Sequence, residues 1–211
     1  MIELNNISKN IKGESILKNI NLKLYEGKVY GFQGRNESGK TMLFRAITGL
    51  IGVDFGSVIV NGLKLNNYYF AKDVGLLLEN PSFLPYLSGK KNLQMIASLR
   101  KVIYENRIDK ILKLVGLYDA RDKAFGKYSL GMKQRLALGQ AIMEYPKILV
   151  LDEPTNAIDD QGIKVLKDIV KGEKEKSTIV LIASHEKEII DDLADEIFLM
   201  KDGEIREHII K

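Results

Sequence analysis

The sequence contains no cysteine, which excludes disulfide bridges and cysteine-based metal sites and is compatible with a reducing compartment. It also lacks any apolar run of the ~18–20 residues that a membrane-spanning helix needs. Its longest apolar runs, at 148–151 and 179–183, have the length of strands. The start of the chain, MIELNNISKN, has no charged region followed by an apolar one, so we expect no signal peptide. We therefore expect that this chain does not form a membrane pore by itself.

The size and charge of the chain are those of an ordinary globular protein. Hydrophobic residues make up 45% and charged residues 28% of the 211 residues, which suffice for one large α/β domain or two small ones. The formal net charge of +4 is mild, and the lysines are scattered along the chain. A nucleic-acid-binding face needs basic residues concentrated together, so we expect a solvated surface and no nucleic-acid partner.

Apolar residues follow two different periods along the chain. Ile20, Leu22 and Leu24 alternate with polar residues, as in a strand, whereas Leu43 and Ile47 lie one helical turn apart. We expect helices at 40–50, through much of 88–137, and at 163–170 and 186–194. We expect strands within 2–26 and at 28–32, 57–60, 74–78, 147–151, 178–183, 197–200 and 204–209. This alternation favours a single α/β domain with a mainly parallel sheet and an inserted helical lobe at about 80–137.

A glycine-rich segment lies between the strand expected at 28–32 and the helix expected at 40–50. Backbone N–H groups of such a loop, at a helix N-terminus, can point together at a polyphosphate. Lys40 would reach the β- and γ-phosphates, and the Thr41 hydroxyl would ligate Mg²⁺. The alternative is a glycine turn that merely opens a helix. The segment matches the pattern G-x-x-x-x-G-K-[ST], and with the residue that follows it the candidate site is Gly34, Arg35, Asn36, Glu37, Ser38, Gly39, Lys40, Thr41 and Met42.

Two carboxylates follow the apolar strand at 147–151. Ligands of open α/β sheets bind at the carboxyl ends of strands, so Asp152 is placed to hold Mg²⁺ directly or through water. Glu153 could polarise the water that attacks the γ-phosphate. The alternative is a solvated strand end at which a loop begins. His185 follows the next strand at the matching end and could sense the γ-phosphate, although a lone histidine is more often structural or exposed.

A third motif makes the interpretation specific. Residues 128–135, Tyr-Ser-Leu-Gly-Met-Lys-Gln-Arg, resemble the signature motif L-S-G-G-Q of ATP-binding cassette (ABC) proteins and the Gln-Arg pair that usually follows it. Alone, they could be a serine–glycine turn that opens a helix. The phosphate loop, the signature, the Asp152–Glu153 pair and His185 also occur in the family's order and with similar spacing, over essentially the whole chain.

The resemblance implies a P-loop NTPase fold in one domain over 1–211, with a mainly parallel sheet, an N-terminal antiparallel β subdomain and an inserted helical subdomain. It implies an ATP-hydrolysing transporter subunit whose cofactors are ATP and Mg²⁺. By matching position, Glu79 stands at the family's Q-loop glutamine, Asp159 at the D-loop aspartate and His185 at the switch histidine. Together with Glu153, these residues would form the catalytic set. The metal ligands would be Thr41, Asp152 and Glu79.

The resemblance also implies partners. Ser129 and Gly131 match signature residues that contact the γ-phosphate of ATP held by the other subunit, which implies a two-fold head-to-tail dimer, with a second copy, around two ATP. Serine and its neighbours at a helix start would supply N–H donors and a favourable dipole. Multi-span membrane permease subunits would be further partners, which would place the chain at the inner face of the cell membrane, on its cytoplasmic side.

The apolar, proline-marked segment 79–88 is where the family receives a short helix of the permease. Phe83, Leu84 and Tyr86 are our candidates for that groove, with a small satellite core under a loop as the alternative. In style, this segment and 128–135 are most similar to exporters of peptide antibiotics of the bacitracin and lantibiotic type.

Three residues depart from the family pattern. Glu37 replaces a loop glycine; if the position needs a positive φ angle, this costs on the order of 1–3 kcal/mol, and a carboxylate beside triphosphate adds repulsion. Glu79 replaces an amide with a charge near the metal. Ile11 falls where the family often stacks an aromatic ring on adenine. Two alternatives therefore remain: a nucleotide-gated subunit with little hydrolysis, and a soluble ABC ATPase acting on nucleic acid. The second is disfavoured because its relatives usually carry two cassettes or coiled-coil insertions.

Overall fold

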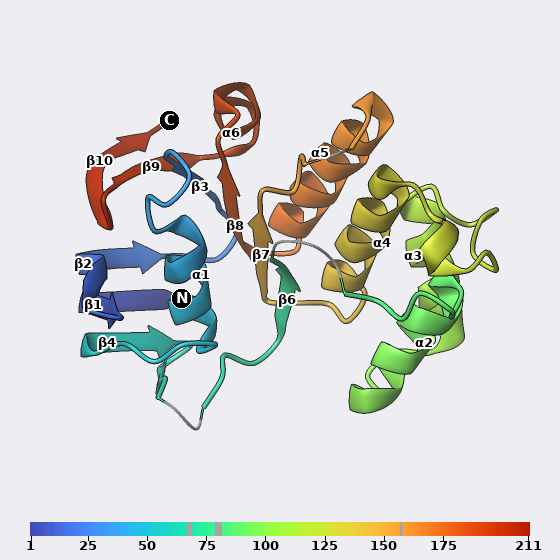
Figure 1. Ribbon diagram of the computed structural model, residues 1–211, viewed down its shortest axis with the longest axis horizontal. Coiled ribbons are helices and arrows are strands. Elements are labelled where there is room, and N and C mark those ends of the chain that lie inside the picture. Colours follow the sequence, from blue (N-terminus) through green and yellow to red (C-terminus); the bar gives the residue numbers. More distant parts are fainter. Residues whose placement is uncertain (67–68, 79–81, 157) are drawn as a thin grey trace.

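The computed structural model describes residues 1–66, 69–78, 82–156 and 158–211, and Figure 1 labels most of its elements. The helices are α1 (Lys40–Thr48), α2 (Gly89–Arg100), α3 (Glu105–Leu114), the 3-10 helix η1 (Phe125–Lys127), α4 (Leu130–Ile142), α5 (Asp160–Glu175) and α6 (Lys187–Leu193). The strands are β1 (Ile2–Ile11), β2 (Glu14–Leu24), β3 (Val29–Gln33), β4 (Phe55–Val60), β5 (Leu63–Lys64), β6 (Val74–Leu77), β7 (Ile148–Asp152), β8 (Ile179–Ser184), β9 (Glu196–Lys201) and β10 (Glu204–Ile210).

The strands form two sheets of different kinds. The first has the order β2-β1-β4-β5, and its pairings are antiparallel. The second has the order β10-β9-β3-β8-β7-β6, in which β9, β3, β8, β7 and β6 run parallel and β10 is an antiparallel edge. The structure thus confirms a mainly parallel α/β sheet accompanied by an antiparallel N-terminal sheet. Helix α1 contacts strands of both sheets and lies beside both in Figure 1.

Strands β7 and β8 are buried along their whole length, because both faces of this sheet are covered. Successive side chains of a strand point to opposite faces. Accordingly, Ile148 and Val150 belong to the hydrophobic core that includes residues of α1, whereas Leu149 and Leu151 belong to the core that includes residues of α4 and α5. The carboxyl end of β7 is therefore fixed by packing on both sides.

The helix that follows the glycine loop, predicted at 40–50, ends at Thr48. Gly49 adopts a φ of 80°, and its N–H donates to the carbonyl of Ala46 at 3.1 Å. Glycine takes this left-handed conformation at little steric cost, which is why it commonly terminates helices.

Helices α2, α3 and α4 lie together on the side of the molecule away from the N-terminal sheet (Figure 1). Helix α3 contacts both α2 and α4, and α4 packs on β6. The expected helical character of 88–137 is present in these helices, but residues 115–129 form turns and the short η1 instead. None of the helices in the described ranges combines the length and the apolar character that crossing a bilayer requires.

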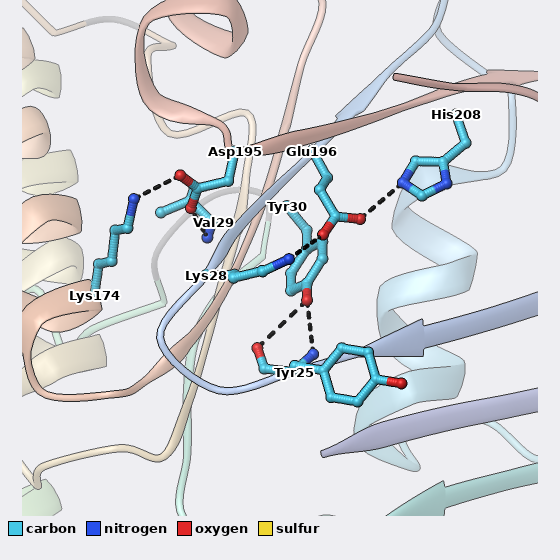
Figure 2. A network of polar contacts seen from close by, with 8 residues as sticks. All are labelled: Tyr25, Lys28, Val29, Tyr30, Lys174, Asp195, Glu196 and His208. Carbon is cyan, nitrogen blue, oxygen red and sulfur yellow. Dashed lines mark hydrogen bonds and ion pairs between the residues drawn. The ribbon is translucent and has the colours of Figure 1, made fainter. Parts of the chain in front are cut away.

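A polar network lies at the amino ends of β3 and β9 (Figure 2). Glu196 is 7% exposed and accepts a hydrogen bond from Lys28 Nζ at 2.6 Å, and its other oxygen lies 2.7 Å from His208 Nε2. Burial alone would raise the pKa of Glu196, but the hydrogen bonds with Lys28 and His208 outweigh it and hold the pKa below the ordinary 4.5.

The neighbouring Asp195 is held in the same way. It accepts from Lys174 Nζ at 2.6 Å and from the N–H of Val29 at 2.9 Å. Burial again acts to raise the pKa of Asp195, and these hydrogen bonds lower it below the ordinary 3.8. Both carboxylates therefore favour the folded state as long as they are ionised.

Above pH 4.5, Asp195 and Glu196 should contribute their full stabilisation to the free energy of unfolding. As the pH falls below 4.5 and through their lowered pKa values in the folded state, this stabilisation should be lost. Replacing Glu196 with Gln should remove roughly 1–3 kcal/mol at pH 7, because Lys28 loses its charged partner, and should make the acid decline shallower. Urea unfolding at a series of pH values measures both effects. Glu207→Gln, on the exposed part of β10, is the control, and an equally steep decline in Glu196→Gln would contradict the prediction.

Candidate nucleotide-binding site

The glycine loop joins β3 to α1 and is packed tightly against the rest of the chain. A Cβ atom on Gly34 would lie 2.4 Å from the carbonyl oxygen of Met200, so a side chain there is excluded. Gly39 caps α1 with a φ of 102°. The N–H of Gly203, in the turn between β9 and β10, donates to the carbonyl of Ser38 at 3.1 Å. These contacts hold the loop in a fixed shape at the N-terminus of a helix, where backbone N–H groups attract anions.

Lys40 is buried inside this loop, with 6% of its surface exposed. Its Nζ donates to the carbonyls of Gly34 at 2.7 Å and Arg35 at 3.1 Å, and lies 3.8 Å from Glu153 Oε1. A lysine has three donors and is rarely buried unless its charge is compensated. Here the two carbonyls and the carboxylate place that charge at the base of the loop, within reach of a phosphate that the loop would hold.

Thr41 and Asp152 meet at the carboxyl end of β7. The Thr41 hydroxyl donates to Asp152 Oδ2 at 2.5 Å, and Asp152 is 3% exposed. A hydroxyl and a carboxylate suit Mg²⁺, which takes oxygen ligands, keeps several waters and is commonly held by one or two carboxylates together with substrate phosphates. Within the described residues, no group of three or more acidic or histidine side chains is placed to hold a metal ion.

Glu153 and His185 are in direct contact, which the sequence analysis did not predict. His185 Nδ1 lies 2.8 Å from Glu153 Oε2, and the backbone N–H of His185 donates to the same oxygen at 3.3 Å. The register of β7 and β8 explains the contact, because Asp152 pairs with Ala183 and so places the residues that follow each strand side by side. Glu153 also adopts a left-handed φ of 48°.

Lys40, Thr41, Asp152 and Glu153 line one cavity of about 730 Å³, whereas His185 is not among its lining residues. The lining combines the loop and the first turn of α1 with the end of β7, and adds two segments that sequence reasoning missed. One is in β2 and the other is the turn between β9 and β10; only tertiary packing brings them to the loop. The lining residues are Glu14, Ser15, Ile16, Lys18, Asn36, Glu37, Ser38, Gly39, Lys40, Thr41, Met42, Asp152, Glu153, Asp202 and Gly203.

The charged side chains that line this cavity are mainly acidic. It carries two lysines, Lys18 and Lys40, against five carboxylates, which belong to Glu14, Glu37, Asp152, Glu153 and Asp202. A polyphosphate entering alone would meet net repulsion, which a divalent cation relieves. The Ser38 Oγ is also buried and has no hydrogen-bond partner among the described residues, so it is an unused polar group within the loop. Both observations fit a site for a metal–nucleotide complex.

Other predicted residues are placed as follows. Glu37 lines the cavity with a φ of 67°, the left-handed conformation considered for this position. Ile11 ends β1, is 37% exposed and is not among the lining residues, whereas Ile16 is. Arg35 contributes a carbonyl to Lys40 and is otherwise exposed. Glu79 lies outside the described residues.

The signature residues do not line the chain's own cavity. Ser129 caps α4, and its Oγ accepts from the N–H of Met132 at 3.2 Å, so it opens a helix as predicted; Gly131 lies in the first turn of that helix. Asp159 likewise caps α5, and its Oδ1 accepts from the N–H of Gly162 at 2.9 Å. Both helix starts are exposed and available to a partner.

The candidate residues for a permease contact differ in exposure. Phe83 packs its ring 5.0 Å from that of Phe125 and is partly buried against one of the two main hydrophobic cores, rather than in a separate satellite core. Leu84 is half-buried, and Tyr86 is 73% exposed. Of the three, Tyr86 presents the largest free apolar surface.

Comparison with known proteins agrees with this geometry. A family model described as ABC transporter matches residues 17–156. The uncharacterized ABC transporter ATP-binding protein YybJ of Bacillus subtilis (strain 168) is 42% identical over 206 residues, covering 97% of this chain and 94% of that protein. The bacitracin transport ATP-binding protein BcrA of Enterococcus faecalis is 37% identical over 99% of this chain and 69% of its own length. The lantibiotic transport ATP-binding protein SrtF of Streptococcus pyogenes is 33% identical over 97% of this chain and 89% of its own length.

Solved structures show the same fold at lower identity. An ATP-binding subunit of an ABC transporter superposes with a TM-score of 0.91 at 20% identity, over 100% of this chain and 90% of that one. The ATP-binding cassette MJ0796, described as a dimer in a post-hydrolysis state bound to ADP and Pi, superposes with a TM-score of 0.88 at 23% identity, over 100% and 98%. On the family match and the sequence identities, the chain belongs to the ATP-binding subunits of ABC transporters, a family of ATPases.

Proposed function

We propose that the chain binds Mg-ATP in the cavity beside α1 and hydrolyses it with Glu153 as the residue that activates water. The observation that carries this proposal is the convergence of Lys40, the Thr41–Asp152 pair and Glu153 on a single cavity, with His185 in contact with Glu153. Phosphoryl transfer depends mainly on positioning and on neutralising charge, and these residues supply both.

In this mechanism the loop N–H groups hold the phosphates, and Lys40 turns its ammonium group from the loop carbonyls to the β- and γ-phosphates. Mg²⁺, when bound by Thr41 and Asp152, would neutralise charge on the phosphate oxygens. Glu153 would take up the proton of the attacking water. His185 Nδ1, 2.8 Å from Glu153 Oε2, would fix the direction of that carboxylate and would respond to the γ-phosphate through it.

We further propose that the working unit is a two-fold dimer of this chain. The support is that Ser129 and Gly131 lie at the exposed start of α4, outside the chain's own cavity, so they can reach a nucleotide only if a second copy presents one. The N–H groups at the start of α4 suit the γ-phosphate of that nucleotide. Asp159, capping α5, would lie near the same interface.

The transport role is proposed from the relatives. Their names associate them with bacitracin and lantibiotic transport, and this supports export of peptide antibiotics through multi-span permease subunits at the inner face of the cell membrane. The exposed Tyr86, next to α2, is our candidate for a permease contact. Dimer closure around two ATP would move the permease, and hydrolysis would release it.

A second candidate function is a nucleotide-gated subunit with slow hydrolysis. Glu37 favours it, because its left-handed φ of 67° is strained for a residue with a side chain and its carboxylate adds to an acidic cavity. The two functions differ in turnover, so the variants below separate them.

Replacing Glu153 with Gln should lower the ATPase rate at least ~100-fold, because the water loses its base, while nucleotide affinity is kept. The variant should also form a longer-lived dimer with Mg-ATP, visible by size-exclusion chromatography. Single-turnover hydrolysis on the purified chain measures the rate, with the exposed Glu188→Gln in α6 as a matched control. Equal, slow hydrolysis by the wild type and Glu153→Gln would favour the gated subunit instead.

Replacing Lys40 with Ala should weaken Mg-ATP binding by ~100-fold or more, because a buried charge that faces the phosphates is lost. Titration with a fluorescent ATP analogue measures the dissociation constant. Lys164→Ala, on the exposed face of α5, should leave it unchanged. An unchanged affinity in Lys40→Ala would mean that the phosphates are bound elsewhere.

The strain and the charge of Glu37 can be separated by two substitutions. Glu37→Ala removes the carboxylate and should tighten ATP binding by up to about fivefold, because exposed charges interact weakly. Glu37→Gly also relieves the left-handed backbone and should raise the free energy of unfolding by ~1 kcal/mol over Glu37→Ala. Affinity measured with and without Mg²⁺ should show the larger gain without it. A weaker affinity in Glu37→Ala would assign the carboxylate a binding role instead.

A further inference from the structure

Asn92 is a fully buried polar residue that the mechanism above does not use. It lies in the first turn of α2 and is 0% exposed. Its Oδ1 accepts from the N–H of Leu84 at 2.9 Å, and its Nδ2 donates to the carbonyls of Leu84 at 3.1 Å, Leu87 at 3.3 Å and Ser88 at 3.1 Å. One side-chain amide thus satisfies backbone groups along the whole loop that enters α2.

That loop is in turn joined to the segment that precedes α4. The N–H of Phe125 donates to the carbonyl of Leu87 at 2.8 Å, and the N–H of Gly126 donates to the carbonyl of Pro85 at 2.8 Å. The rings of Phe83 and Phe125 pack 5.0 Å apart. The two segments are distant in sequence, yet backbone hydrogen bonds and ring packing make them one unit.

The joined segment leads directly into the signature serine. Tyr128 packs its ring 5.8 Å from Phe125, and its hydroxyl donates to the carbonyl of Ala120 at 2.8 Å. Ser129 follows at once and starts α4. The position of Ser129 therefore depends on a segment whose partner loop is held by Asn92.

We infer that Asn92 is a positioning residue for the signature: its amide fixes residues 84–88, these fix residues 125–126, and the start of α4 takes its place from them. The inference rests on the proposed function, because Ser129 is there assigned to the nucleotide of a second copy. Asn92 touches neither the cavity nor Ser129, so its removal acts on dimer formation and leaves the chain's own nucleotide site intact.

The chemistry of this position is demanding. An amide supplies one acceptor and two donors at once. Aspartate would set a carboxylate against three carbonyl oxygens. Alanine would remove the acceptor of the Leu84 N–H and one donor from each of the three carbonyls, so either substitution loosens the loop.

The test uses the full chain with Glu153→Gln as the parent, in which the Mg-ATP dimer persists. Asn92→Ala should raise the dimer dissociation constant, measured by analytical ultracentrifugation, roughly 3- to 30-fold, the range for residues that modulate coupling without touching the ligand. The ATP affinity of the monomer, measured at low protein concentration, should stay within about twofold, because the sites are separate.

A second variant changes the contact between residues 84–88 and 125–126 at Gly126 instead of Asn92. A Cβ on Gly126 would lie 3.1 Å from the carbonyl oxygen of Pro85, so Gly126→Ala should push the two segments apart without altering Asn92. It should weaken the dimer in the same direction, and it decides the question if Asn92→Ala fails to fold. Ser88→Ala is the matched control, because it removes the N-cap of α2 and leaves the Asn92 contacts.

Dimers as tight as the parent in both Asn92→Ala and Gly126→Ala would overturn the inference. So would an equal weakening in Ser88→Ala, since helix stability rather than the loop contact would then be responsible. If the Glu153→Gln parent binds ATP but does not dimerise, the proposed function fails and the inference falls with it.

Discussion

The hydrogen bond from Thr41 to Asp152 joins two residues that lie 111 positions apart in the sequence. It joins the first turn of α1 to the carboxyl end of β7, and the residues next to it, Lys40 and Glu153, also line the cavity. Because β7 is packed on both sides, this contact transfers the rigidity of the sheet to the glycine loop. Lys40 and Glu153 then lie 3.8 Å apart as a consequence of where their neighbours are fixed. Pre-organisation of this kind is what phosphoryl transfer requires of a protein.

The charges of the cavity explain why a cation belongs to the ligand. The lining carries more carboxylates than lysines. Glu37 lines the cavity from the glycine loop, Asp202 from the turn between β9 and β10, and Asp152 and Glu153 from the end of β7. A metal ion inverts the local electrostatics, because it turns carboxylates from repelling groups into ligands and orienting groups.

The sequence motifs located those residues whose spacing is local. The glycine loop and the Asp152–Glu153 pair could be predicted because strand, turn and helix follow each other directly. Ile16 and Gly203 could not, since they reach the cavity through packing between the two sheets. The contact of His185 with Glu153 also escaped prediction; it depends on which strands are neighbours, and periodicity does not reveal strand order. The prediction of helix through much of 88–137 is wrong for residues 115–129, where the buried Val115, Leu117, Phe125 and Tyr128 hold turns and η1 against the hydrophobic core.

Strand β7 contributes alternate side chains to two hydrophobic cores, and it ends at the residue that contacts Thr41. The two cores share β7, so loosening one core exposes one face of this strand and removes support from the core on its other face. The antiparallel sheet around α1 and the layer of helices on the other face are therefore expected to melt together, in one cooperative transition. A nucleotide held at the tip of that strand would then stabilise the entire molecule and not only its own surroundings.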